Sequence, residues 1–391
     1  MDTLESAFEI NQASIGSGPP SGTDGAPATT CYRFHFTGSG KEYFKIWIVN
    51  LFLTIVSIGI YSAWAKVRRL QYFDRNTQLA GAVFDFDGDP RAILRGRILA
   101  LGLLGAYQYA FGFSLTAGIL TALALLAALP LAMRSALRFR LRNTCYRGMR
   151  FGFLGAATTA YMTYLPPLLM FLLPAVLLAL DPSGKTVGFI AILYLLWPLM
   201  HGFMKRYQHA NMAFGSLNAV YAVSPLRFYV PYLKSIGMFL IGMISAFIIM
   251  AVVGVAVSAS GMAIPKPYIF LATVASGVLM AYITYLIAGP YLQVRIGNMV
   301  WSATSVPGMT ISSHLKAREY MSLQLVNTLL TLVTLGLYRP FAVVRAYQYR
   351  MDHITITTTS DFEHTFMASR ARAGSASADG VADFLGLDLS W

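Results

Sequence analysis

Charged residues are scarce in this chain, and acidic residues are the scarcest. Of its 391 residues, 12% are charged and 56% are hydrophobic, with 17 Asp and Glu against 30 Lys and Arg. Because about a quarter of the residues of a soluble domain are charged, this composition excludes an ordinary soluble protein and indicates an integral membrane protein. The long apolar runs contain no Asp or Glu. Proton- and sodium-coupled transporters usually place a carboxylate near the middle of the membrane, so its absence disfavours them.

Residues that typically carry catalysis or bind metals are also few. The two cysteines, Cys31 and Cys145, cannot build a disulfide framework, and the six histidines form no H-E-x-x-H pair. Walker, G-x-S-x-G and dinucleotide-binding motifs are absent. Asp85, Asp87 and Asp89 alternate and could hold a divalent cation, but such a run is more often a solvated face or pairs with Arg91 and Arg95. We therefore predict no catalytic residue, no metal and no cofactor.

Long apolar runs are what the chain has in abundance. A spanning helix needs about 20 apolar residues, and most of these runs are long enough. One run, 98–133, is too long for a single helix, so we expect it to fold back near residues 112–114. The fold class we predict is an all-α polytopic bundle of about eight membrane segments. The runs are 46–65, 98–133, 151–180, 186–204, 235–265, 267–294 and 320–338.

The distribution of basic residues predicts which side each segment faces. Basic groups follow the apolar runs, so by the positive-inside rule these groups are cytoplasmic. If 46–65 and 320–338 both span, both chain ends lie outside, and if both re-enter around Gly59 and Gly336, six crossings remain and the ends lie inside. Length favours eight crossings, whereas charge favours six. Candidates for contact with anionic lipids are Lys66, Arg68, Arg75, Arg138, Arg142 and Arg345.

One segment of the chain occurs twice. Residues 40–72 are matched by 317–349, with a polar Asn, a Gly and a Tyr-to-Arg exit at corresponding places. Such self-similarity predicts an internal repeat. An asparagine in lipid commonly bonds to a neighbouring helix and stabilises packing, and alternatively it lines a polar cavity. The candidates for cavity lining or packing are Asn50, Thr54, Gly59, Asn327, Thr331 and Gly336.

A shorter motif, F-x-F-x-G, lies beside the apolar runs. It occurs at 34–38, 84–88 and 151–155, and the last two follow an Arg-Asn-Thr at the same spacing. Alternating aromatic residues that end in glycine predict short strands with one apolar face. These strands either pair into a small cytoplasmic sheet or serve only as interfacial aromatic anchors. The motif residues are Asn76, Phe84, Phe86, Asn143, Phe151 and Phe153.

The same segments resemble a known family. The strings YRFHFTGSG at 32–40, YFKIWIVN at 43–50 and GIYSAWAKVR at 59–68 are similar to the YjgN-like family of bacterial inner-membrane proteins, which is built around a domain of unknown function. The resemblance implies an inner-membrane location and no established activity. In the second copy Phe341 and Val343 replace Trp64 and Lys66. The two halves are therefore not expected to be equivalent in a shared site.

These observations divide the chain and suggest two functions. We predict a disordered tail over 1–30, which is rich in Gly, Ser, Pro and Thr, a membrane domain over 31–368 and a C-terminal tail over 369–391. The first hypothesis is binding or passage of a small solute or lipid through a helix-lined cavity, without an energising module. The alternative is a non-transporting membrane scaffold or lipid-organising protein, which organises lipids or partner proteins through its basic cytoplasmic face. Membrane lipids are the expected partners, nucleic acid is not expected because the basic groups lack stacking aromatics, and the oligomeric state is left open.

Overall fold

Short strands recur between the helices along the whole described chain. The structure is a computed structural model that describes residues 29–180, 192–260 and 265–358. The strands in these residues are β1 (Thr30–Phe36), β2 (Thr77–Leu79), β3 (Ala82–Phe86), β4 (Thr144–Tyr146), β5 (Met149–Phe153), β6 (Met212–Phe214), β7 (Leu217–Asn218), β8 (Val220–Tyr221), β9 (Thr304–Val306), β10 (Met309–Ser313) and β11 (Ile354–Thr358).

All the described strands belong to one antiparallel sheet. Its order is β7-β6-β5-β4-β3-β2-β1-β11-β10-β9-β8. The two strands at the ends of this order, β7 and β8, are separated along the chain only by Ala219. β1 pairs with β11, with Thr30 opposite Thr358, so the first and last described strands are neighbours. The sheet is therefore nearly closed, which leaves few unpaired edges.

This sheet corrects the predicted fold class. Strands do lie over the F-x-F-x-G motifs, but they pair into one sheet that organises the whole described chain, so the all-α prediction is wrong. Two-residue turns connect β2 to β3 and β4 to β5. Ala80 and Gly81, and likewise Arg147 and Gly148, have positive φ. This is the backbone conformation of tight hairpin turns, whose twist matches that of the strands.

The aromatic residues of the motif face the interior. Phe84 lies opposite Tyr146 in the sheet and stacks on it with ring centroids 4.5 Å apart. Phe151 pairs in the same way with the next strand, opposite Phe214. These rings join one apolar cluster around Leu79 and Tyr146. Phe86, fully buried, instead packs against the helices.

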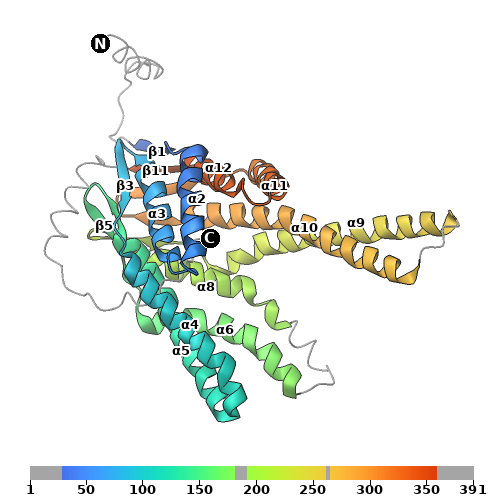
Figure 1. Ribbon diagram of the computed structural model, residues 1–391. Coiled ribbons are helices and arrows are strands. Elements are labelled where there is room, and N and C mark those ends of the chain that lie inside the picture. The colour runs from blue at the N-terminus through green and yellow to red at the C-terminus, as the bar shows by residue number, and fades with distance from the viewer. Residues whose placement is uncertain (1–28, 181–191, 261–264, 359–391) are drawn as a thin grey trace, which may run out of the picture.

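Pairs of helices alternate with the strands (Figure 1). Each pair leaves the sheet after one strand and returns the chain to the next strand. The helices in the described residues are α2 (Gly40–Val56), α3 (Ser62–Arg75), α4 (Pro90–Phe113), α5 (Leu115–Asn143), α6 (Ala157–Leu180), α8 (Trp197–Ala210), α9 (Tyr229–Ala259), α10 (Lys266–Ser302), α11 (Ala317–Val333) and α12 (Arg339–Asp352), with a 3-10 turn η1 (Pro225–Phe228) before α9.

Neighbouring helices pack around the sheet in chain order. α12 packs against α2, which closes the circuit that the sheet also follows. The longest pairs diverge from each other away from the sheet: α4 and α5, with α6 beside them, extend in one direction and α9 with α10 in another (Figure 1). The predicted fold-back near 112–114 is confirmed, because α4 ends at Phe113 and Ser114 caps α5 by accepting a hydrogen bond from the backbone N–H of Ala117 at 3.0 Å.

The number of membrane segments also differs from the prediction. In the described residues, three helices are long and apolar enough to cross a membrane, Leu115–Asn143, Pro225–Ala259 and Phe270–Ser302. The expected eight crossings, and the alternative count of six, are therefore wrong. Within the run 46–65 the helix α2 has only 17 residues, a length of about 26 Å against a hydrocarbon core of about 30 Å. The predicted tails, 1–30 and 369–391, lie outside the described residues apart from positions 29 and 30.

Candidate functional site

The two matched segments form helical hairpins with the same turn. Between α2 and α3 the backbone turns at Gly59, with φ of 86°, and between α11 and α12 it turns at Gly336, with φ of 94°. The Gly59 N–H donates to the Thr54 carbonyl, and the Gly336 N–H to the Thr331 carbonyl, both at 2.7 Å. Only glycine adopts such a φ without strain, so each glycine is placed here by the turn.

Asn50 and Asn327 are buried inside these hairpins. Their side chains are 7% and 3% exposed, and the Asn327 Nδ2 donates to the Ala342 carbonyl at 3.3 Å. In the described residues the Oδ1 atoms of both asparagines are buried without a hydrogen-bond donor. The hydroxyls of Thr54 and Thr331 donate back to the carbonyls of Asn50 and Asn327 at 2.6 Å, so both threonines are satisfied within their own helix. Buried oxygens without a donor are costly and call for an explanation.

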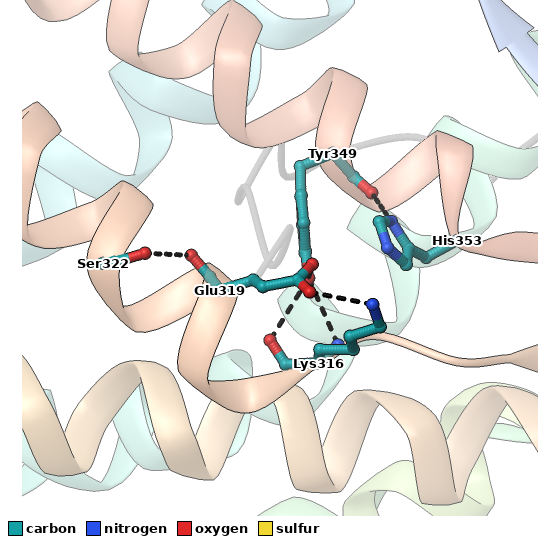
Figure 2. Close-up of polar contacts among 5 residues, drawn as sticks. All are labelled: Lys316, Glu319, Ser322, Tyr349 and His353. Atoms are coloured by element: carbon teal, nitrogen blue, oxygen red, sulfur yellow. Dashed lines mark hydrogen bonds and ion pairs between the residues drawn. The ribbon is translucent and has the colours of Figure 1, made fainter.

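A polar cluster lies at the sheet end of α11 and α12 (Figure 2). The Lys316 Nζ donates to the Glu319 Oε1 at 2.8 Å, and the Tyr349 hydroxyl donates to the Glu319 Oε2 at 3.2 Å. The backbone N–H of Lys316 donates to the same hydroxyl at 3.2 Å. The ring of His353 lies beside Tyr349, with its Nδ1 2.8 Å from the Tyr349 carbonyl. The cluster ties the start of α11 to the end of α12.

The other matched hairpin repeats this contact. The Tyr72 hydroxyl donates to the Ser39 carbonyl at 2.8 Å and reaches the Glu42 Oε2 at 3.3 Å. Burial raises the pKa of Tyr72 to about 12, so this hydroxyl remains a donor at neutral pH. Tyr72 and Tyr349 were outside the predicted site residues. The signal that would have found them is the Gln-Tyr pair that ends both copies of the repeat.

The alternating aspartates are each placed beside an arginine. All six side chains are substantially exposed, so each pair is worth less than about 1 kcal/mol. Hydrogen bonding to the Arg75 guanidinium lowers the pKa of Asp85, in spite of an opposing effect of burial. Of the two arginines expected to pair with this run, Arg95 does so, whereas the partners Arg75 and Arg150 were not expected. The pairs are Arg75–Asp85 at 2.7 Å, Arg150–Asp87 at 3.9 Å and Arg95–Asp89 at 4.0 Å.

The basic residues predicted to contact anionic lipids lie on α3, α5 and α12, which are helices that return the chain to the sheet. The Arg68 guanidinium stacks over the Tyr61 ring at 5.8 Å from its centroid. The Arg345 Nη1 donates to the Tyr338 hydroxyl at 2.8 Å. Tyr61 and Arg68 occupy the same positions in the first matched hairpin as Tyr338 and Arg345 do in the second. In both hairpins the arginine therefore contacts the tyrosine directly. The remaining candidates are Lys66, Arg75, Arg138 and Arg142.

The asparagines of the strand motif cap helices. The Asn76 Nδ2 donates to the Tyr72 carbonyl, and the Asn143 Nδ2 to the Phe139 carbonyl, both at 2.7 Å. Their backbone carbonyls each accept from the residue after a neighbouring F-x-F, at 2.9 Å. Asn76, Asn143, Phe86 and Phe153 therefore connect helices to the sheet, whereas Phe84 and Phe151 pack among strand residues.

A basic pocket lies at the base of the α9–α10 hairpin, where η1 leads into α9. Its volume is about 400 Å³. Arg227, Lys234 and Arg295 line it, together with Tyr291 and apolar side chains. The Arg295 guanidinium lies over the Tyr291 ring, with its Cζ 5.6 Å from the centroid. The sequence indicated basic residues here but did not reveal that residues of η1, α9 and α10 form one pocket.

A second pocket, of about 410 Å³, lies between α11 and α12. Its charged lining residues are Arg345 and Asp352, so their charges balance. Neighbouring uncharged side chains, including Ser322 and Gln348, complete the lining. The two pockets are thus similar in size and differ in charge.

Comparison with known proteins identifies the family. The family described as "Bacterial protein of unknown function (DUF898)" matches residues 31–384. The chain belongs to this family. The resemblance inferred from the repeated segment is thereby confirmed, and the family description assigns no activity.

The curated relatives share one name with each other, "Inner membrane protein YjgN". Over 162 residues the chain is 32% identical to the "Inner membrane protein YjgN" of Salmonella typhimurium, covering 39% of this chain and 40% of the relative. Over 147 residues it is 29% identical to a protein of that name from Escherichia coli, covering 36% of this chain and 35% of the relative. The matched parts thus span well under half the length of these relatives. No solved structure matches.

The family member is a bacterial inner-membrane protein, as the sequence predicted. Its relatives are named for that membrane. Its described residues also include helices long and apolar enough to cross one. Three observations therefore define the site to be explained: the buried asparagines of the matched hairpins, the polar contacts at the hairpin bases and the basic pocket.

Proposed function

We propose that this protein binds anionic phospholipids of the inner membrane and organises them at its cytoplasmic face, without carrying a solute across. This is the second of the two functions considered from the sequence. The observation that carries it is the surface of the candidate membrane helices. In their most apolar windows, only 6% of the α9 residues, 6% of the α10 residues and 17% of the α5 residues are buried inside the protein.

The exposure of these helices favours contact with lipid over an enclosed path for a solute. Helices that enclose a path for a solute bury one face against one another, whereas these helices leave large apolar side chains such as Phe247, Phe270 and Leu123 exposed. The α9–α10 hairpin also diverges from α4, α5 and α6 away from the sheet (Figure 1). Lipid tails would then cover most of the surface of each hairpin, since lipid is the solvent of a membrane helix.

The arrangement of charge supports the cytoplasmic side. Every helix pair in the described residues begins and ends at the sheet, which supports a position of the whole sheet on one side of the membrane. The net charge is +13, and Lys or Arg residues lie on every helix that returns the chain to the sheet, α3, α5, α8, α10 and α12. The positive-inside rule places that side in the cytoplasm. Each Lys or Arg near an anionic leaflet adds about 1 kcal/mol of attraction.

The proposal includes an internally repeated architecture. The matched hairpins share their turn, their buried asparagine and their tyrosine contact to a glutamate. The strand motifs share their register, because Phe86 lies opposite Thr144, and Phe153 lies opposite Met212 at the equivalent place of the next strand pair. A repeated hairpin-and-strand unit would present several similar lipid-facing hairpins from one sheet.

Quenching of tryptophan fluorescence by brominated lipids tests the proposal. The full chain would be reconstituted into vesicles of mixed phosphatidylglycerol and phosphatidylcholine, with one lipid brominated at a time. Because brominated lipid quenches only nearby tryptophans, preferred binding gives stronger quenching by brominated phosphatidylglycerol at equal fraction, and the difference shrinks at high salt. Equal quenching by the two lipids at low salt would overturn the proposal.

The second candidate is binding of a small solute between the matched hairpins. The buried Oδ1 atoms of Asn50 and Asn327 favour it, since two acceptors without donors suit a hydrogen-bond donor from a ligand. A cysteine scan at positions 50, 54, 327 and 331, on a background lacking Cys31 and Cys145, tests this in intact cells. Labelling by a membrane-impermeant thiol reagent supports a solute path. Full protection of these positions, with labelling at the chain ends, argues against it.

A further inference from the structure

We propose that Arg227, Lys234 and Arg295 form a specific site for the phosphate of one anionic phospholipid, at the base of the α9–α10 hairpin. The inference rests on the proposed function and deepens it. It assigns the lipid to one specific site, whereas general electrostatic attraction would involve the whole basic face. Three features carry it: the level of the three cations along the hairpin, their charge balance and the shape of the pocket.

The three cations lie where the apolar part of the hairpin begins. From residue 235 to 259, α9 has no charged residue, and from 267 to 294 α10 has none. The α9 stretch is about 37 Å long at 1.5 Å per residue, enough to cross a hydrocarbon core of about 30 Å. Lys234 and Arg295 directly flank these stretches, at the same end of the hairpin. That end of the hairpin would lie at the depth of the lipid phosphates. Arg227 lies in η1, between the sheet and α9.

The charge of the pocket is uncompensated within the described residues. No acidic side chain lines it, whereas the second pocket pairs Arg345 with Asp352. Arginines elsewhere at the sheet side also have acidic neighbours, as Arg75 does with Asp85. An anion is therefore the ligand that the electrostatics of this pocket favour. Basic pockets at the cytoplasmic ends of membrane helices are known to bind anionic lipid headgroups.

The shape of the pocket fits a headgroup joined to acyl chains. At about 400 Å³ it lies within the usual range of small-ligand sites, about 300–1,000 Å³. Tyr291 holds the Arg295 guanidinium over its ring, which orients one donor group. Val230 and Met299 supply apolar lining beside the cations. The phosphodiester of a phospholipid would contact the cationic part of this lining, and its acyl chains would contact the apolar part and continue along the hairpin. A free anion would contact only the cationic part.

Native mass spectrometry of the full chain in detergent tests the site, with dioleoyl phosphatidylglycerol as probe and dioleoyl phosphatidylcholine for comparison. The test variant combines R227Q, K234Q and R295Q. Removing three cations should weaken the tightest phosphatidylglycerol binding about 100-fold, from about 1 kcal/mol per cation and 1.4 kcal/mol per factor of ten. The matched control combines R318Q, R339Q and R350Q, three exposed positions, which removes the same charge from α11 and α12 and should leave that binding unchanged.

The outcomes separate this site from the wider proposal. Equal weakening in both triple variants would overturn the specific site and leave general attraction of anionic lipid in place. No preference of the unchanged protein for phosphatidylglycerol over phosphatidylcholine would overturn both proposals. Displacement of the lipid by millimolar inorganic phosphate, with phosphate retained by the unchanged protein but not by the test variant, would assign the pocket to a free anion and overturn the lipid assignment.

Two single variants keep the site testable if the triple test variant misfolds. Lys234 is exposed, so K234Q should fold and should weaken binding about fivefold on the same scale. K234R keeps the charge and should bind like the unchanged protein. If K234Q binds as tightly as K234R, the cation at this position does not contact the lipid, and the site is wrong.

Discussion

At the glycine that ends each F-x-F-x-G motif there is no room for a side chain, because a motif phenylalanine and a helix side chain lie within about 3 Å of where its Cβ would be, and Gly155 offers a test. A Cβ added at Gly155 would lie 2.6 Å from the Phe153 Cε1 and 2.7 Å from the Tyr207 hydroxyl oxygen. Both neighbouring side chains are buried, at 5% and 3% exposed, and the Tyr207 hydroxyl donates to the Ala156 carbonyl at 3.1 Å. Gly155→Ala therefore forces a buried ring to move.

The expected cost follows from overpacking. An extra methyl group in a filled core costs about 1–3 kcal/mol, because buried side chains leave their preferred rotamers. At about 2.1 cal/mol/K of unfolding entropy per residue, each 1 kcal/mol lowers the melting temperature of a 391-residue chain by about 1 °C, so a drop of about 1–4 °C is expected. The measurement is thermal unfolding of the purified protein in detergent, followed by near-UV circular dichroism. Gly105→Ala is the control, since a Cβ at Gly105 meets nothing within 4 Å.

A second substitution isolates the cause. Phe153→Leu removes ring atoms, so the double variant should recover part of the loss that Gly155→Ala shows alone, a coupling that a double-mutant cycle measures. An unchanged melting temperature for Gly155→Ala would refute the reasoning. It would mean that the motif is an interfacial anchor whose glycine is free to carry a side chain.

Other predictions concern pH, a turn and the tyrosine contacts. Burial raises the pKa of Asp74 to about 6, despite opposition from Arg140, so the contribution of Asp74 to stability is fully present below about pH 4 and decreases by about 3 kcal/mol as pH rises to about 6. D74N should abolish this decrease between pH 4 and 6, and an unchanged pH slope would contradict it. Gly59→Ala strains a φ of 86° and should cost about 1 kcal/mol in thermal unfolding, whereas an unchanged melting temperature would mean that the turn relaxes. Y349F and Y72F each remove a hydroxyl that bridges two helices and should each lose about 0.5–1.5 kcal/mol; a loss in only one would show that the matched contacts are not equivalent.

Local features of the chain were predictable because they depend on neighbouring residues. The alternation of Phe84 and Phe86 indicated a strand, although it did not indicate which strand would be its partner. The break near residues 112–114 was predictable because the run 98–133 is too long for one helix, and in the structure Ser114 caps the second helix. The glycines of the matched segments were singled out, although the sequence did not decide between a helix that continues through Gly59 and one that turns there.

The partners of each segment could not be read from the sequence. The miscount of membrane segments arose because the length of an apolar run counts residues and ignores where the backbone turns. The sites were hidden for a related reason: Glu319 and Tyr349 lie 30 residues apart, and the pocket joins Arg227 to Arg295 across a whole hairpin. Asn50 and Asn327 were selected as polar residues in apolar runs, and their burial with unpaired oxygens became visible only in the folded chain.

The sequence by itself determined that this is a membrane protein with a cationic side, and it indicated the family. These properties are sums over residues: each apolar side chain favours the bilayer and each charge adds to the net +13 whatever its neighbours are. Only the tertiary structure decided that the strands form a nearly closed sheet, that the matched runs fold back as short hairpins and that three cations of one hairpin share a pocket. These features are pairings between distant segments, and their free energy exists only once both partners are in place.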